Sequence, residues 1–505
     1  MLTNSTSYSF QVEADALLRE IDGAWLREEP LSAVDRANRT ALRNWLKRYH
    51  PPTNSNTLEQ VKHFLEAFYH LCSIAQWQLA SRVLAVPMAE GELHNQLGIW
   101  GHFQTQIQLY QQLLHQLSPN LDLVFLNGLG SVYFMLKDCD RAMEYFDRAF
   151  SLSIEGSSPY WQGSILGNLA SVHDFLGNKT EAIHCYEESL KIASAIEDLQ
   201  MQANALGNLG TVYQGMGQFN KALTYHQQDL ALARQLQNQH AESYALANIG
   251  VVYFYLGDYA AAVSYHQQDW ALTQLIQDDW GKGVALGNLG NVYFVQGQYP
   301  KAMEHYEAGL EIARQIGDRW GEGTMLGSIG NIHISSQDFS LAIDSYHQSL
   351  RLFQGIADSR GESIALSNLG NVYHEMGDDR QAVEYHQPAL DLAQKISDRP
   401  AQAIALSGLG SSLLGLQQYD SAMDTLTLAL ELSQEIGYRA LIAQTLKYLA
   451  DWYERQHQIQ EALEYCDRAL QLATELGLPL AQECQARKSQ LLNGFEFKYF
   501  DEGFM

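Results

Sequence analysis

Asparagine recurs at one position of a long periodic pattern in this chain. Five asparagines are spaced at multiples of 40 residues, and each directly precedes a leucine or an isoleucine: Asn168, Asn208, Asn248, Asn288 and Asn368. A carboxamide has both a donor and an acceptor, so a row of carboxamides can bind the N–H and C=O groups of an extended peptide. Backbone contacts of this kind give affinity with loose sequence demands, and neighbouring side chains then set the preference.

Histidines recur as well, at His226, His266 and His386. Equivalent positions on stacked neighbouring helices lie about 8–10 Å or more apart, whereas the ligands of one metal need bonds of about 2 Å. Each of the first two histidines has an aspartate three residues later, Asp229 and Asp269, so that local pairing on a helix is expected. With no HExxH motif and no nucleophile elbow in the chain, we predict no catalytic residues, no metal site and no cofactor.

Glycine-rich segments such as GNLGNVY at 287–293 resemble nucleotide-binding loops only superficially. They recur every 40 residues and follow predicted helices rather than a strand. The phosphate loop GxxxxGK[ST] occurs nowhere in the chain. We interpret these glycines as packing positions between helices.

The elements that position these residues are nine copies of a 40-residue unit. A central pair, Leu or Ile followed by Gly or Ala, recurs at this spacing from Leu129 to Leu449, and an alanine follows each pair from Ala142 to Ala462. Apolar residues at helical spacing predict two helices in each copy, separated by turns such as GQY and GDY. Because one hairpin cannot bury its own apolar face, the copies must stack, and we predict an all-α solenoid.

These residues carry a resemblance to a known family. The Leu-Gly pair, the tyrosine that follows it, the Gly-x-Tyr turn and the late Ala-Leu pair resemble the tetratricopeptide repeat (TPR). The 40-residue version is most similar to kinesin light chains and the Pins/LGN polarity adaptors. The resemblance covers 123–492 and implies a right-handed superhelix of helical hairpins, with a concave groove that is lined by asparagines, as in O-GlcNAc transferase.

Composition and sequence breaks divide the chain into segments. The break RYHPPTNSNT at 48–57 separates two expected helices, around Ala16–Arg27 and Leu31–Tyr49, from a new helix that begins at Thr57 or Leu58. The segment 58–117 resembles the arm that joins ATPase modules to repeats in STAND-type signalling proteins. The predicted organisation is an N-terminal helical segment at 1–56, degenerate helical hairpins at 57–122, nine repeats at 123–478, a capping helix at 479–493 and a tail at 494–505.

Charge and composition limit the classes of partner and compartment. The formal net charge is −26 and the pI is near 5.0, which disfavours nucleic acid and favours a neutral or basic protein or peptide. The start of the chain lacks a signal-peptide pattern, and its most apolar stretch, at 404–416, is too short and too rich in Gly and Ser to span a membrane. Five scattered cysteines are typical of a reducing compartment. We predict a cytoplasmic protein with no membrane contact, and the oligomeric state is left open.

The sequence therefore predicts a non-enzymatic scaffold or adaptor that binds an extended peptide or a disordered segment. The asparagine position shares a helix face with the residues four before it, three after it and seven after it. The best groove lies between about residues 204 and 375, because the asparagine pattern lapses at Gly128 and Gly408. The predicted peptide-binding residues are Asn204, Asn208, Tyr244, Asn248, Tyr255, Asn288, Asn291, Asn331, Asn368 and Asn371.

Alternative interpretations stay open at this point. The asparagines can serve mainly the helix turns, and the two tyrosines can pack on adjacent repeats. A second function is a signalling regulator or peptide receptor, in which the N-terminal helices of 1–117 relay the binding of a ligand to the repeats. Rap-type peptide receptors, which have a helical bundle before such repeats, make this function conceivable.

Overall fold

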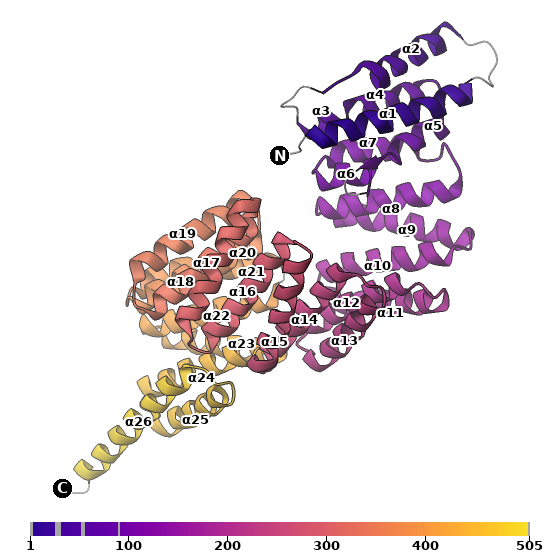
Figure 1. The fold of residues 1–505 in the computed structure, drawn as a ribbon. Helices are drawn as coiled ribbons and strands as arrows, with labels where there is room; N and C mark the ends of the chain where they lie inside the picture. The colour runs from indigo at the N-terminus through magenta and orange to yellow at the C-terminus, as the bar shows by residue number, and fades with distance from the viewer. Residues whose placement is uncertain (1–3, 26–31, 52–55, 89–90, 397, 503–505) are drawn as a thin grey trace. The chain divides into compact units, whose positions relative to one another are not determined.

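The computed structural model describes residues 4–25, 32–51, 56–88, 91–396 and 398–502 (Figure 1). Its internal contacts divide the chain into two compact units, unit 1 from Met1 to Glu197 and unit 2 from Asp198 to Met505. None of the described helices combines the length and the hydrophobicity that a membrane span requires.

Among the described residues of unit 1, the secondary structure is helical apart from one two-stranded pair, in which β1 (Pro87–Met88) lies antiparallel to β2 (Gly91–Glu92). Of the two helices expected near the N-terminus, the first begins earlier than expected, and the predicted ends at Arg27 and Leu31 lie outside the described residues. The helices of unit 1 are α1 (Asn4–Trp25), α2 (Ala33–Arg48), α3 (Thr57–Gln60), α4 (Lys62–Ser73), α5 (Trp77–Leu84), α6 (Leu93–Ile99), α7 (Phe103–Leu113), α8 (Pro119–Met135), α9 (Cys139–Glu155), α10 (Pro159–Phe175) and α11 (Lys179–Ala195).

Unit 2 continues the same helical hairpins, and Figure 1 shows them packed in consecutive pairs. From α8 to α25, the first and the second helices of successive repeats each begin at 40-residue intervals, which confirms the predicted all-α repeat. The helices of unit 2 are α12 (Leu199–Gly215), α13 (Phe219–Gln235), α14 (Gln239–Leu256), α15 (Tyr259–Leu275), α16 (Asp279–Val295), α17 (Tyr299–Ile316), α18 (Arg319–Ser335), α19 (Phe339–Gly355), α20 (Ser359–Glu375), α21 (Asp379–Lys395), α22 (Arg399–Gly415), α23 (Tyr419–Glu435), α24 (Arg439–Arg455), α25 (Ile459–Glu475) and α26 (Leu480–Glu502).

The turns between helices have sequence-encoded caps. Asp278 accepts a hydrogen bond from the backbone N–H of Gly281 at 2.9 Å, and Asp318 caps α18 in the same way. These aspartates satisfy N–H groups that the first helical turn leaves without a partner. Gly297 has a φ of 73°, in the left-handed region that favours glycine, and so ends α16 as the sequence indicates.

Close packing within each repeat depends on the small residue of the central pair. A Cβ atom added to Gly290 would lie 2.5 Å from the ring of Tyr306, which belongs to the second helix of the same repeat. Gly210 has the same relation to His226. The glycine therefore makes room for a buried ring, as expected for a packing position.

The later repeats of unit 2 also contact its earlier ones. A Cβ atom added to Gly217, in the turn after α12, would lie 2.2 Å from the carbonyl oxygen of Ile436, in the turn after α23. Tyr255 at the end of α14 stacks on Phe219 with ring centroids 5.3 Å apart, and its ring centroid is 5.8 Å from that of Tyr438. The turns of the third and fourth repeats thus pack on the turn that closes the eighth.

The C-terminal helix α26 covers the last repeat. Leu480, Cys484 and Leu491 are buried in one cluster with residues of α24 and α25. The sequence predicts a capping helix at 479–493 and then a tail, whereas α26 continues without a break to Glu502. Residues 503–505 of the expected tail lie outside the described part of the chain.

Candidate functional site

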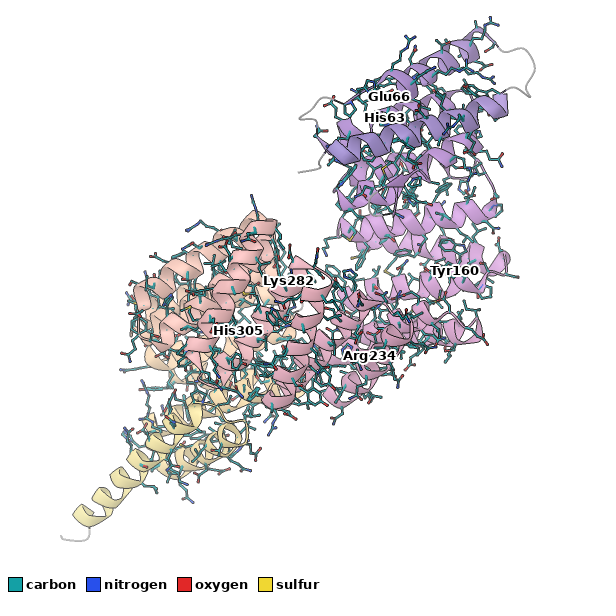
Figure 2. All side chains as sticks on the ribbon, viewed as in Figure 1. His63, Glu66, Tyr160, Arg234, Lys282 and His305 are labelled. Atoms are coloured by element: carbon teal, nitrogen blue, oxygen red, sulfur yellow. The ribbon has the colours of Figure 1, made fainter. Side chains whose placement is uncertain are left out.

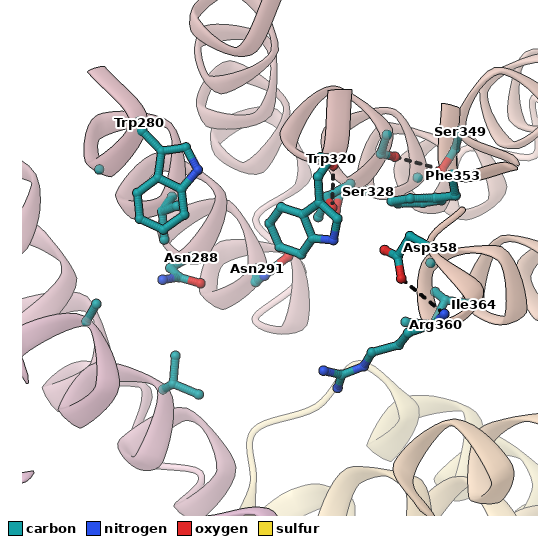
Figure 3. A pocket seen from close by; sticks show the side chains of 18 of the residues that line it. Trp280, Asn288, Asn291, Trp320, Ser328, Ser349, Phe353, Asp358, Arg360 and Ile364 are labelled. Carbon is teal, nitrogen blue, oxygen red and sulfur yellow. Dashed lines mark hydrogen bonds between the residues drawn. The ribbon is translucent and has the colours of Figure 1, made fainter. Parts of the chain in front are cut away.

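A cavity of about 670 Å³ lies along the first helices of four successive repeats in unit 2, α14, α16, α18 and α20 (Figure 3). It corresponds to the middle of the groove that the sequence predicts. Seven of the ten predicted residues line this cavity: Tyr244, Asn248, Tyr255, Asn288, Asn291, Asn331 and Asn368.

The other three predicted residues do not line the cavity. Asn204 and Asn208 are exposed on α12, where Asn204 accepts a hydrogen bond from Gln200 at 3.0 Å. Asn371 is half-buried on α20, about one helical turn beyond Asn368. The seven predicted residues that the structure brings together all come from repeats four to seven, which span 239–398.

The hydrogen bonds of the cavity asparagines separate two groups. Asn291 and Asn331 each accept a hydrogen bond from a tyrosine hydroxyl, Tyr306 at 2.8 Å and Tyr346 at 2.5 Å. Both tyrosines are buried rings of the second helices, so each of these two amides also joins the two helices of its own repeat. By contrast, no described residue forms a hydrogen bond with the side chain of any of three others, Asn248, Asn288 and Asn368.

The same face is filled beyond α20. Four small residues of α22 are buried there, namely Ser407, Gly408, Ser411 and Ser412. A Cβ atom added to Gly408 would lie 2.3 Å from the ring of His386, and Ser407 lies within hydrogen-bond distance of Thr445 on α24, at 3.1 Å. The lapse of the asparagine pattern at Gly408 thus coincides with close helix packing, in which these positions are buried.

Aromatic side chains that are not among the predicted site residues form part of the cavity wall. Trp280 and Trp320 are 42% and 48% exposed, and Figure 3 shows both indoles projecting toward the cavity. Phe353 of α19 lines it as well. The signal was available, because the two tryptophans are 40 residues apart and Trp280 stands eight residues before Asn288, on the same helix face.

A smaller slot of about 70 Å³ opens between the two tryptophans. Gly283, Gly287 and Gly309 line it together with Met325. A Cβ atom at Gly287 would lie 2.5 Å from the terminal methyl carbon of Met325, so the slot owes its shape to the absence of side chains. Its apolar walls can take a small aliphatic group.

Carboxylates dominate the charge of the cavity. Asp269, Asp278 and Asp358 line it, together with a single described cation, Arg360, which forms an ion pair with Asp398 at 2.8 Å. Two further cations of unit 2, both labelled in Figure 2, are also engaged: Lys282 pairs with Asp279 at 2.7 Å, and Arg234 pairs with Glu242 at 2.8 Å. The electrostatic balance of the cavity is acidic.

The recurrent histidines are packing residues. His226 and His386 are fully buried, and neither ring nitrogen of either side chain has a hydrogen-bond partner among the described residues. The expected local pairing with aspartate is therefore wrong for His226, and no hydrogen bond or ion pair joins His266 to Asp269. Burial lowers the pKa of His226 and His266 to about 4 and that of His386 to about 3, so the rings are neutral near pH 7.

Possible metal ligands are dispersed over the described part of the chain. No group of three or more His, Cys, Asp or Glu side chains among the described residues is arranged to hold a metal ion. The buried histidines lie instead against glycines of the first helices, as in the contact of His266 with Gly250.

Similar architectures occur among solved structures. A STAND ATPase with a tetratricopeptide repeat sensor from Pyrococcus horikoshii is 15% identical, with a TM-score of 0.49 over 76% of this chain and only 56% of its own length. A Rap protein complexed with competence and sporulation factor is 16% identical, with a TM-score of 0.49 over 78% of this chain and 99% of its own. The quorum sensor NprR from B. thuringiensis is 13% identical, with a TM-score of 0.49 over 75% of this chain and 99% of its own.

Sequence comparison is informative at the level of the family. No curated protein sequence matches the chain. The family description "Tetratricopeptide repeat" matches residues 122–195, 201–268, 282–355 and 361–435, which together make up more than half of the chain. With the 40-residue helical hairpins of the structure, these matches show that the chain belongs to the tetratricopeptide repeat family.

Proposed function

We propose that this protein is a non-enzymatic scaffold that binds an extended peptide, or a disordered segment of a partner protein, along α14 to α20. The proposal rests on the hydrogen bonding of three side-chain amides that line the cavity. Asn248, Asn288 and Asn368 lie at equivalent positions, line one cavity and have no hydrogen bond to another described residue. A polar group that lines a cavity without a protein partner is available to a ligand.

The geometry supports binding through the peptide backbone. Each amide offers one acceptor and two donors, which match the C=O and N–H groups of an extended chain. The exposed tryptophans supply apolar surface for side chains, and the slot between them can select a small aliphatic one. The cavity volume of about 670 Å³ lies in the range of sites that bury a small ligand or a short peptide segment.

The test uses the full chain and a random library of N-terminally acetylated decapeptides. We expect the wild-type protein to select peptides, and the triple variant Asn248→Ala, Asn288→Ala, Asn368→Ala to bind them one to three powers of ten more weakly, if the losses add. Asn220→Ala is the control, because Asn220 is an exposed asparagine of α13 that does not line the cavity and is not among the predicted contacts. Unchanged affinity of a triple variant that melts like the wild type would show that the ligand binds elsewhere.

The sequence also makes predictions that concern residues outside the cavity and the location of the protein. Asn204, Asn208 and Asn371 stay predicted contacts for a ligand that extends beyond the cavity. The relay of ligand binding through residues 1–117 likewise stays a prediction, as does the cytoplasmic location. A neutral or basic ligand suits the acidic cavity.

A further inference from the structure

Asp269 of α15 is an unusual group beside the cavity. Its side chain is 1% exposed and borders the cavity. The Ser243 hydroxyl donates a hydrogen bond to Oδ1, and no described residue donates one to Oδ2. Burying a carboxylate without a full set of donors is costly. Repeats five and six have Gly309 and Ser349 at the same position, so the fold does not need an acid there.

Three neighbours complete an acidic corner, which we define as Asp269, Asp278, Tyr244 and Trp280. All four line the cavity. The rings of Tyr244 and Trp280 have centroids 6.1 Å apart, and both side chains are more than 40% exposed. Burial raises the pKa of Asp269 to about 6, against the opposing effect of the Ser243 hydrogen bond, and the negative charge of Asp278 raises it as well.

No described basic side chain neutralises Asp269. Asp278 caps α16 through one oxygen, and its other oxygen is 3.8 Å from Nδ1 of the exposed His240. Arg360, the cation that lines the cavity, is paired with Asp398. Oδ2 of Asp269 can therefore accept a hydrogen bond from a positively charged donor of a ligand.

We propose that the acidic corner receives one lysine or arginine side chain of the bound peptide, an inference that rests on the proposed peptide-binding function. The ammonium or guanidinium group donates to Oδ2 of Asp269, and the charge makes this bond stronger than a neutral one. The faces of Tyr244 and Trp280 attract a cation as well. The net charge of −26 adds a long-range attraction for cationic ligands.

The chain provides a matched control at Asp229, the equivalent residue of the preceding repeat. Asp229 is also buried, at 8% exposure, and burial raises its pKa to about 6, as for Asp269. It does not line the cavity. Asp229→Asn and Asp269→Asn thus remove comparable buried charges, and only the second changes the cavity.

The experiment starts from acetylated decapeptides that the full-length wild-type protein selects from the random library. Acetylation removes the N-terminal ammonium, so a retained cation must be a side chain. Selected peptides are resynthesised with norleucine in place of lysine or citrulline in place of arginine, and their affinities are measured for the wild type, Asp269→Asn and Asp229→Asn. Thermal melts of all three proteins are recorded. The amide introduced by Asp269→Asn keeps the shape of the carboxylate and its capacity to accept the Ser243 hydrogen bond.

We expect the wild type to select peptides with a lysine or an arginine at one fixed position. Neutralising that residue weakens binding to the wild type and to Asp229→Asn by roughly ten- to a hundredfold, but changes binding to Asp269→Asn by less than about threefold. Selected peptides without a preferred cation, or an equal loss with Asp269→Asn, would overturn the acidic corner and leave the peptide-binding function standing. Selection of no peptide at all would overturn both proposals.

Discussion

The face formed by the first helices of unit 2 has two contrasting stretches. Along α14 to α20, asparagines and tryptophans border an open cavity. On α22 the corresponding positions are small and buried, and Gly408 touches His386 of the preceding repeat. Both stretches have the same hairpin and the same 40-residue period. The repeat therefore fixes the packing of its hairpins, while the residues on this face decide whether a groove exists.

The largest effect is expected from filling the open stretch. Thr324 lines both the cavity and the slot, so Thr324→Trp places an indole where the peptide would lie. We expect the affinity for selected decapeptides to fall by at least about a hundredfold, because the site then clashes with the ligand. The melting temperature should change little, since Thr324 is not part of the core. Wild-type affinity in a folded Thr324→Trp protein would place the ligand outside this cavity.

On α22, where the face is filled, a substitution should change the stability of the fold and not ligand binding. In Gly408→Ala the new Cβ lies 2.3 Å from the His386 ring, which is fully buried, so overpacking should lower the free energy of unfolding by about 1–3 kcal/mol. Gly283→Ala is the matched control in the open stretch, where the nearest atom is 3.9 Å away. In Gly283→Ala the gain in helix propensity should raise the free energy of unfolding by about 0.5–1 kcal/mol. Denaturant unfolding measures both, and equal effects would contradict the contrast between the two stretches.

A smaller effect separates the two groups of cavity asparagines. Asn331→Ala leaves the Tyr346 hydroxyl without its acceptor and should lower the free energy of unfolding by about 1 kcal/mol. Asn288→Ala should leave stability unchanged, because no described residue depends on that amide. In a double-mutant cycle, Asn331→Ala should cost little in a protein that already carries Tyr346→Phe. A full loss in that Tyr346→Phe background would show that the hydrogen bond is not the cause.

The fold was predictable from the sequence to the level of single helices in the repeats. Strict 40-residue spacing, capping aspartates and the Leu-Gly pair each indicate the same hairpin, so local and long-range signals agree. The short strands β1 and β2 carry no comparable periodicity and were not predicted. The division of the chain at Glu197 falls inside the uniform repeat pattern, where the residues carry no sign of it.

The site was predictable in part. Seven predicted residues line the cavity, because a helix face follows directly from residue spacing. The tyrosine bonds of Asn291 and Asn331 could not be deduced, since they depend on how far a side chain of the second helix reaches. The environment of Asp269 was not predicted for a similar reason. The sequence spacing suggested a histidine partner, whereas its hydrogen bond comes from Ser243 on another helix.

The smallest expected effect is on the pH dependence of stability. Burial lowers the pKa of His226, His266 and His386, so the unfolded chain binds more protons below pH 6.5 and stability falls as the pH falls toward 4. Burial raises the pKa of Asp229 and Asp269 to about 6. The folded chain then binds more protons between about pH 4 and 6, so these two groups stabilise it as the pH falls.

The two aspartates offset only part of the loss from the three histidines, so the wild type should lose some stability between pH 6 and 4.5. The double variant Asp229→Asn, Asp269→Asn lacks the aspartate contribution, so its stability should fall more steeply over the same range, while at pH 7 it should be at least as stable as the wild type. Urea unfolding at pH 7, 6, 5 and 4.5 gives both slopes. Parallel slopes would mean that the two aspartates titrate near their ordinary pKa. A double variant that is less stable than the wild type at pH 7 would mean that the two charges stabilise the fold.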